Sequence, residues 1–269
     1  MRIKLKMYTT IIALFCSLMA CEELIDLKHG ESETRLVVDG TITNGPGPYY
    51  VFLQQTKSFK TNDEPSPVTD AVVTIVDDLD NQEVLEHIGK GVYEIDDIQG
   101  AIGRTYSLNI EYNGKTYASE ATLLPVSEID ETEVNFRKET TELDEGYYVT
   151  IGMPLTSPGE ISYYRWLVTE NDSLYSGVDN FIITSDEFLA DHISFELEYA
   201  FELDDKVAIE MHSLSEEAYN YYMALSELAE SDGGLFSPSP VNPISNITNG
   251  ALGLFRASAV SKVEVVIEN

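Results

Sequence analysis

The chain has 269 residues, with 16 Lys and Arg against 47 Asp and Glu, so its formal net charge at pH 7 is −31. Nucleic-acid-binding proteins neutralise phosphates with clustered Lys and Arg, so this composition excludes nucleic acid as the expected partner. The acidity also argues against a protein that lies flat on an anionic membrane surface. It fits two alternatives: solubility outside the cytoplasm, or a surface that collects cations or docks a basic partner.

The N-terminus has the pattern of a secretory signal peptide at residues 1–20. Basic residues precede an apolar run at residues 11–20. This run is shorter than the roughly 20 apolar residues that a membrane-spanning helix needs. The run ends in Leu-Met-Ala-Cys at Cys21, which resembles the bacterial lipobox. The resemblance implies cleavage before Cys21 and a lipid on its sulfur; the alternative is an ordinary signal peptide that contains a cysteine.

Lipidation of Cys21 predicts an exported chain that meets the membrane through this anchor. The two cysteines are Cys16 and Cys21, so the mature chain has no disulfide and its fold must rest on its own core. Several acyl chains make a lasting anchor, where one chain alone is marginal. Acidic residues at 22–26 resemble a surface-export signal of Bacteroidota lipoproteins. We therefore expect outer-membrane anchoring, at the cell surface or otherwise on the periplasmic face, with residues 21–33 as a tether.

The next part of the chain, residues 34–125, alternates apolar and polar residues between turn signals. Short strands at regular spacing predict an antiparallel sandwich, immunoglobulin-like or transthyretin-like in class. Asn113-Gly114 is the strongest short hairpin signal, and residues 44–47 form a second turn between two strands. The expected strands are 35–43, 48–55, 71–76, 82–87, 91–96, 104–112 and 115–124.

The remaining part, residues 126–269, predicts a second β-rich domain with one helix at about 214–230. Ser213 with Glu216 forms a capping-box pattern, and Ala218, Tyr222, Leu225 and Ala229 recur at helical spacing. This stripe suits core packing better than an interface. The expected strands are 146–155, 161–169, 193–201, 206–211 and 257–267, the last preceded by residues 250–255.

Motifs for catalysis are missing from the sequence, so we expect no enzyme, no cofactor and no metal. The four histidines have no metal-ligand spacing, and neither HExxH nor GxSxG occurs. Carboxylate pairs carry little information in so acidic a chain. Asp77, Asp78 and Asp80 could offer oxygen ligands to Ca²⁺, but Asp and Asn are also ordinary turn formers. A solvated hairpin turn is the favoured interpretation.

Two stretches are candidates for a ligand or partner surface. One is the aromatic strand with Tyr163 and Trp166; the other is a Pro-rich loop with Phe236, Pro238 and Pro240. Core packing and a rigid loop over a sheet edge are the alternative interpretations. Separately, Asp172-Ser173-Leu174 resembles the Bacteroidota O-glycosylation motif, which makes Ser173 a candidate acceptor on a predicted turn.

Several segments together resemble a Bacteroidota outer-membrane lipoprotein family, domain of unknown function 4249. The resemblance covers nearly the whole mature chain, although Leu254 stands where the family more usually has Tyr. The segments that carry it are 36–42, 67–75, 91–93, 103–108, 216–222, 236–238, 246–247 and 250–255. Members tend to be encoded beside TonB-dependent outer-membrane transporters. The resemblance therefore implies, by analogy, an accessory lipoprotein of such a transporter and no catalytic residues.

Two functions remain as hypotheses. The first is a non-catalytic accessory or ligand-capture lipoprotein that has a TonB-dependent receptor as its partner. The second is a structural or adhesive surface lipoprotein in which the sandwich acts as a spacer. A hydrolase is a distant third, since only the many carboxylates support it. A stable barrel partner distinguishes the first hypothesis from the second.

Overall fold

The computed structural model describes residues 34–57, 65–141, 143–157, 159–174, 182–187, 192–230 and 242–268. The predicted signal peptide, Cys21 and the tether at 21–33 lie outside these described residues. The chain is mainly β, with several antiparallel sheets, as the sequence predicts. Helix α2 (Glu216–Glu230) is the one α-helix among the described residues. None of their helices is both long and apolar enough to cross a bilayer.

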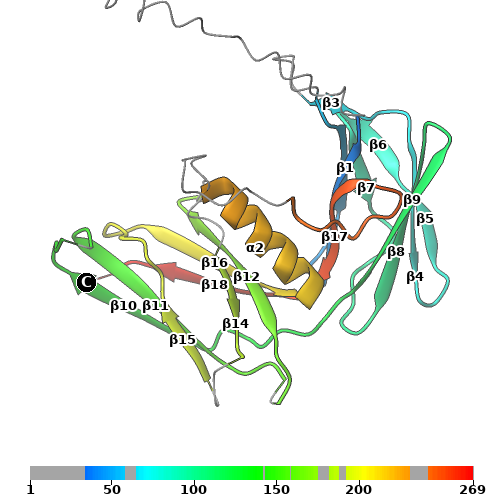
Figure 1. Ribbon diagram of the computed structural model, residues 1–269. Coiled ribbons are helices and arrows are strands. Elements are labelled where there is room, and N and C mark those ends of the chain that lie inside the picture. Colours follow the sequence, from blue (N-terminus) through cyan, green and yellow to red (C-terminus); the bar gives the residue numbers. More distant parts are fainter. Residues whose placement is uncertain are drawn as a thin grey trace, which may run out of the picture. The chain divides into compact units, whose positions relative to one another are not determined.

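Two sheets pack face to face to form the first sandwich (Figure 1). The first sheet contains, in spatial order, β17 (Leu252–Ser258), β1 (Leu36–Thr43), β2 (Tyr49–Gln55), β7 (Val92–Ile95) and β6 (Glu86–Gly89), with β3 (Ser66–Pro67) on β2. The second sheet contains β5 (Gln82–Val84), β4 (Val72–Asp77), β8 (Thr105–Tyr112) and β9 (Lys115–Thr122). Side chains alternate along each strand, so one set from each sheet forms the shared core.

The two hairpins that the sequence predicts most strongly are both confirmed. Strand β1 pairs antiparallel with β2 across the turn at residues 44–47. Strand β8 pairs with β9, and Asn113 and Gly114 have φ angles of 50° and 71°. Positive φ at both turn positions is the geometry that matches the twist of the flanking strands. These local signals therefore set the strand register.

The predicted strand at 82–87 is instead two strands in two different sheets. Strand β5 pairs with β4, whereas β6 pairs with β7. Leu85 lies between them, buried in the core, and its N–H donates to the Val73 carbonyl. The chain crosses from one sheet to the other at Leu85, and the burial of this side chain between the sheets stabilises the crossing.

The second sandwich has its own core, in which Trp166 is fully buried. One sheet contains β10 (Glu131–Arg137), β11 (Gly146–Pro154) and β15 (His192–Glu196). The other contains β13 (Ser173–Leu174), β12 (Tyr163–Glu170), β16 (Lys206–Leu214) and β18 (Val260–Val266), with β14 (Ile182–Ser185) also on β12. Strands β10 and β14 are additions that the sequence analysis did not predict.

The single strand predicted at 257–267 is replaced by β17 and β18, which belong to different sandwiches. Strand β17 pairs in parallel with β1, and β18 pairs with β16. A Cβ at Gly253 would lie 1.8 Å from the Val38 carbonyl oxygen. Only glycine permits this approach, at a φ of 103°. The predicted boundary near residue 125 falls between β9 and β10, and β17 joins the first sandwich from beyond it.

Helix α2 contacts β12, β14 and β16 of the second sandwich and β17 of the first (Figure 1). We call the buried cluster there the junction; its residues are Leu214, Ala218, Tyr222 and Leu254. The predicted helical stripe is confirmed at Ala218, Tyr222 and Leu225, while Ala229 is exposed. The helix therefore closes the space between sheets of the two sandwiches.

The predicted N-cap, Ser213, is wrong, and Ser215 has that role. The Ser215 Oγ accepts a hydrogen bond from the Ala218 N–H at 3.2 Å. Strand β16 continues through Leu214, so Ser213 is a buried strand residue paired with Tyr164. Its Oγ donates to the Leu124 carbonyl at 2.7 Å and accepts from the Ala259 N–H at 2.9 Å. Ser213 therefore joins three chain segments and does not start the helix.

Candidate functional site

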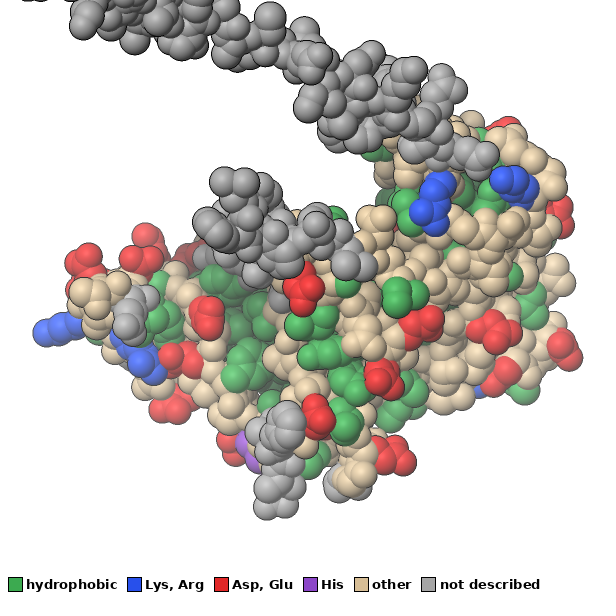
Figure 2. Space-filling view, in the orientation of Figure 1, with side chains coloured by type: hydrophobic (Ala, Val, Ile, Leu, Met, Phe, Trp, Pro, Cys, Tyr) green, Lys and Arg blue, Asp and Glu red, His purple; other side chains and the backbone are tan. Residues whose placement is uncertain are grey.

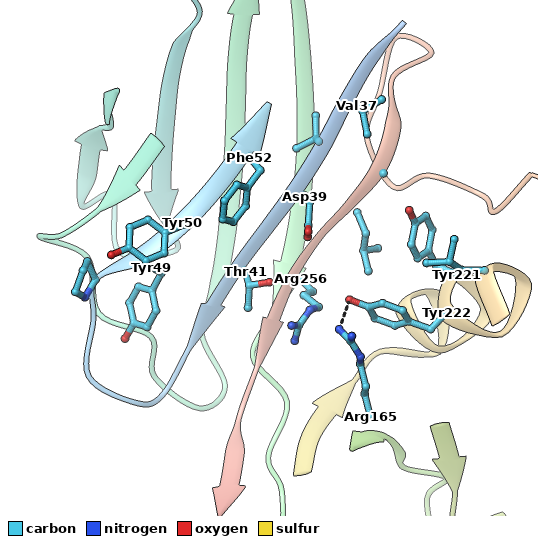
Figure 3. Close-up of a pocket in the computed structure, with 15 residues that line it drawn as sticks. Val37, Asp39, Thr41, Tyr49, Tyr50, Phe52, Arg165, Tyr221, Tyr222 and Arg256 are labelled. Carbon is cyan, nitrogen blue, oxygen red and sulfur yellow. Dashed lines mark hydrogen bonds between the residues drawn. The ribbon is translucent and has the colours of Figure 1, made fainter. Parts of the chain in front are cut away.

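A cavity of about 490 Å³ lies over the outer face of β1, β2 and β17, beside helix α2 (Figure 3). Small-molecule sites in proteins have volumes of roughly 300–1,000 Å³. Strand β12 contributes one further lining residue, Arg165. We call this space the aromatic cavity; β1, β2 and β17 supply one side of its lining, and α2 supplies another.

Aromatic rings line the aromatic cavity on two sides. Tyr50 and Phe52 project from β2, and Phe52 is 41% exposed. Tyr221 and Tyr222 project from α2, with ring centroids 5.7 Å apart in an edge-to-face arrangement. Exposed aromatic rings of this kind offer flat apolar contact to a ligand. The Tyr221 pKa is raised by burial and by its neighbours Tyr222 and Asp39, so its hydroxyl stays neutral and can donate.

Two arginines from different sheets approach the ring of Tyr222 at one end of the cavity (Figure 3). The guanidinium carbon of Arg165 lies 4.5 Å from the ring centroid, and that of Arg256 lies 6.0 Å from it. The Arg165 Nη1 also donates to the Tyr222 hydroxyl at 3.1 Å. Contacts between cations and a ring face hold both guanidinium groups in place.

Neither arginine is neutralised by a carboxylate of the described residues, although the protein carries 47 Asp and Glu. Acidic side chains are spread over the face seen in Figure 2, where Lys and Arg appear at few places. By contrast, Arg104 pairs with Asp77 and Asp78. The Nε atoms of Arg165 and Arg256 are buried and have no hydrogen-bond partner. This end of the cavity therefore concentrates positive charge, and it buries two donors that have no partner.

Burial lowers the pKa of Arg165 below its usual range, and the positive charge of Arg256 acts in the same direction, while the Tyr222 hydroxyl and the Asp39 carboxylate act against both. An arginine remains protonated under these conditions. Burying two cations beside one tyrosine ring is unfavourable, because each loses water and repels the other. A bound anion would relieve both costs, since a guanidinium donates two parallel hydrogen bonds to a carboxylate or phosphate.

A buried histidine lies behind Arg256. The Arg256 Nη1 is 3.4 Å from the His212 Nδ1 and donates to the Ser258 Oγ at 3.1 Å. The His212 Nε2 is 3.3 Å from a Glu210 carboxylate oxygen. Burial lowers the His212 pKa, which makes the ring neutral at pH 7. A neutral ring with its proton on Nε2 satisfies both contacts, so Nδ1 accepts from Arg256 and helps to fix its position.

Of the aromatic strand predicted as a ligand surface, neither Tyr163 nor Trp166 lines the aromatic cavity. Tyr163 is half-buried and stacks on Tyr219 of α2, with ring centroids 4.7 Å apart. Trp166 is not on the surface: alternation along β12 turns it into the second core, where its Nε1 donates to Thr184. The prediction missed Arg165, the neighbour of Trp166 that faces the cavity. Phe236, Pro238 and Pro240 lie outside the described residues.

Arg165 and Arg256 could have been noticed as charged residues within mainly apolar stretches of their strands. In β12 the buried positions are Tyr164, Trp166 and Val168, so an arginine between them must project from the other face. The sequence gives no indication that β12 and β17 lie on either side of Tyr222. That proximity depends on the parallel pairing of β17 with β1.

The acidic turn at residues 77–81 is organised by hydrogen bonds within the hairpin. The Asp77 carboxylate accepts from the Leu79 N–H, the Asn81 N–H and the Asn81 side chain. Together with Arg104, these donors occupy both carboxylate oxygens of Asp77. Across the described residues, no group of three His, Cys, Asp or Glu is placed to hold a metal ion.

Ser173, the predicted glycosylation acceptor, is exposed on the two-residue strand β13. The turn before it contains Asn171 and Asp172, both with positive φ. An exposed serine beside a tight turn is accessible to a modifying enzyme, and its glycosylation stays a prediction.

The sequence profile of one protein family matches residues 22–264, and the description of that family is "Domain of unknown function (DUF4249)". The matched range includes both sandwiches, helix α2 and every residue of the aromatic cavity named above. No curated protein matches the chain.

Proposed function

The chain belongs to the family described as a domain of unknown function, DUF4249, and we propose that it is a non-catalytic ligand-binding lipoprotein of the cell envelope. The observation that carries this proposal is the aromatic cavity, which combines aromatic surface with two guanidinium groups that no carboxylate of the described residues neutralises. Its lining supplies hydrogen-bond donors and flat apolar contacts, which suit the holding of a small molecule.

The proposed location follows from the N-terminal sequence. Signal peptide, lipobox and Cys21 support a lipid anchor, and the acidic residues after Cys21 support the outer membrane of a Bacteroidota cell, with its outer surface preferred. A Cys21→Ala variant should no longer be labelled by an alkyne analogue of palmitate. In a detergent phase-separation experiment, it should move from the detergent phase to the aqueous phase. Labelling of the variant at the wild-type level would contradict the anchor.

We propose further that the protein works beside a TonB-dependent outer-membrane transporter. The resemblance described above supports this partner, and a binding cavity suits an accessory that captures a ligand for uptake. The alternative, a structural or adhesive spacer, would need no cavity with exposed aromatic rings and unneutralised arginines. The aromatic cavity therefore favours ligand capture.

The test is affinity purification of the tagged full-length protein from mildly solubilised outer membranes of its host, followed by mass spectrometry. We expect a TonB-dependent barrel in stoichiometric amount. A second tagged lipoprotein from the same membrane is the control for non-specific recovery. Recovery of the protein alone, in a detergent that keeps known transporter complexes intact, would contradict the accessory function.

A further inference from the structure

We infer that the aromatic cavity binds a small organic oxyanion, a carboxylate or a phosphate monoester attached to an aromatic or otherwise flat apolar body. This inference rests on the proposed ligand-binding function and names the chemical class of the ligand. Arg165 and Arg256 bind the anionic group, and the aromatic rings of α2 and β2 contact the body.

The charge of the ligand follows from the surroundings of the two guanidinium groups. In a protein with a net charge of −31, carboxylates are available almost everywhere on the surface, yet none of the described ones pairs with Arg165 or Arg256. Both groups approach one ring, and each keeps a buried Nε donor without a partner. An anionic group in the cavity can accept hydrogen bonds from the guanidinium groups that line it.

The arginines are held in position before any ligand arrives. Tyr222 contacts both groups and accepts a hydrogen bond from Arg165. Ser258 and the neutral ring of His212 contact Arg256 from the other side. Preorganised donors lose little side-chain entropy on binding, so they favour affinity as well as orientation.

The apolar body of the ligand follows from the rest of the lining. Phe52 is 41% exposed and Tyr50 lies beside it, with ring centroids 6.4 Å apart. Tyr221 and Leu225 line the same cavity from α2. A free inorganic anion would leave these surfaces in water, whereas a flat apolar body removes them from water. Asp39 and Thr41 lie between the two sets (Figure 3); the Asp39 carboxylate can accept hydrogen bonds from polar substituents, and the Thr41 hydroxyl can accept or donate.

The experiment measures binding to the purified mature chain by isothermal titration calorimetry with four probes. These are 2-naphthoate, 2-naphthyl phosphate, the neutral 2-naphthamide and inorganic phosphate. We expect one or both naphthyl anions to bind at least about tenfold more tightly than the amide and inorganic phosphate, because charged hydrogen bonds and apolar contact are both required. The stronger naphthyl anion identifies whether carboxylate or phosphate is preferred.

Variants assign the binding to the two arginines. Arg165→Met and Arg256→Met should each weaken the preferred naphthyl anion at least about tenfold, and Arg104→Met, a distant ion-paired arginine, should leave it unchanged. Arg165→Lys keeps the charge without the planar fork and should give intermediate affinity. Each variant is first checked by its thermal unfolding, and if Arg256→Met fails to fold, Arg165→Lys carries the test.

Equal affinity for 2-naphthoate, 2-naphthyl phosphate and 2-naphthamide, including no binding of any of them, would overturn the inference. Unchanged binding by Arg165→Met and Arg256→Met would overturn it as well. These outcomes are separable from failure of the proposed function. If a barrel co-purifies but the protein does not bind naphthyl anions, the accessory function is supported and this ligand class is not. Anion binding without a barrel leaves the ligand class standing without that partner.

Discussion

The interiors of the two sandwiches and the junction between them bury different kinds of side chain. Inside the sandwiches, buried tyrosine hydroxyls have partners: Tyr93 donates to the Val68 carbonyl and Tyr106 to the Gln99 carbonyl. Around the junction, Arg165 and Arg256 each bury a guanidinium Nε that has no hydrogen-bond partner, and His212 is a buried titratable group with a lowered pKa. Burial of unpartnered polar groups opposes folding. We infer that the cores serve stability, while the two arginines beside the junction are available to bind a ligand.

The largest expected effect belongs to the core. Trp166→Ala should lower the free energy of unfolding by about 3–5 kcal/mol, because it removes a fully buried indole from the second sandwich. Urea denaturation followed by circular dichroism measures this loss. Anion binding by the folded fraction should stay as in the wild type. A binding defect without a stability defect would contradict the assignment of Trp166 to the core, since Trp166 would then act on the aromatic cavity.

Ser213 tests the buried hydrogen bonds that link β16 to Leu124 and Ala259. Ser213→Ala should cost about 1–3 kcal/mol, because the Leu124 carbonyl and the Ala259 N–H both lose their hydroxyl partner in a buried place. The same denaturation experiment measures it. If the free energy of unfolding falls only as little as for an exposed serine, water replaces the Ser213 hydroxyl, and this place is more hydrated than the cores.

The pH dependence of stability tests His212. Burial lowers the pKa of His212 in the folded protein. Below pH 6.5, the His212 ring therefore binds a proton in the unfolded chain but not in the folded chain. Stability therefore falls as the pH falls below 6.5, by at most about 1.4 kcal/mol per pH unit from this one group. Glu210, Arg256 and Arg165 are the charged groups facing it. Only Glu210 titrates at acidic pH, and its lowered pKa adds a loss in the same direction below 4.5.

The matched variant is His212→Gln, which keeps hydrogen-bonding atoms without the titration. Denaturation midpoints at pH 7.5, 6.5 and 5.5 should show a shallower decline for this variant than for the wild type. Parallel declines would mean that other groups cause the acid sensitivity and that the junction is no more pH-dependent than the cores.

The cap of helix α2 gives a smaller effect. Ser215→Ala should cost about 1 kcal/mol, because the Ala218 N–H loses its acceptor at the start of the helix. Ser215→Asp should retain most of the stability, since Asp is an equally good cap. If Ser215→Ala and Ser215→Asp unfold at the same urea concentration, the cap contributes nothing and the helix depends on the junction alone.

The smallest expected effect on stability is at Arg165. Arg165→Met should change the free energy of unfolding by less than about 1 kcal/mol, because the lost contacts with Tyr222 are offset by relief of desolvation and of repulsion from Arg256. Chemical denaturation together with anion titration separates the two roles. A large loss of stability would mean that Arg165 belongs to the fold and has no need of a ligand.

Features with local causes could be predicted from the sequence. The Asn113-Gly114 hairpin follows from residues that accept positive φ, and the helical stripe follows from spacing. The helix cap was misplaced by two residues because Ser213 and Ser215 are equally suitable as caps, and only the length of β16 decides between them.

Features that depend on distant partners could not be predicted. The crossing at Leu85 requires knowledge of both sheets. Likewise, the aromatic cavity exists only because β17 returns to β1 and brings Arg256 to the same tyrosine as Arg165. Trp166 was chosen for its residue type, yet the side of the strand decides exposure, and the side follows from the sheet that packs against it.

The parallel pairing of β1 with β17 has a consequence for the order in which the chain can fold. Residues 36–43 are made first, but one of their neighbours in the sheet is residues 252–258. Until those residues have been synthesised, β1 is an open edge in what later becomes the interior of a sheet, and an open edge invites pairing with other chains. The first sandwich is thus begun early but completed only when nearly the whole chain has been made. A truncation that removes residues 252–258 together with β18 would therefore damage the start of the first sandwich as well as the second sandwich.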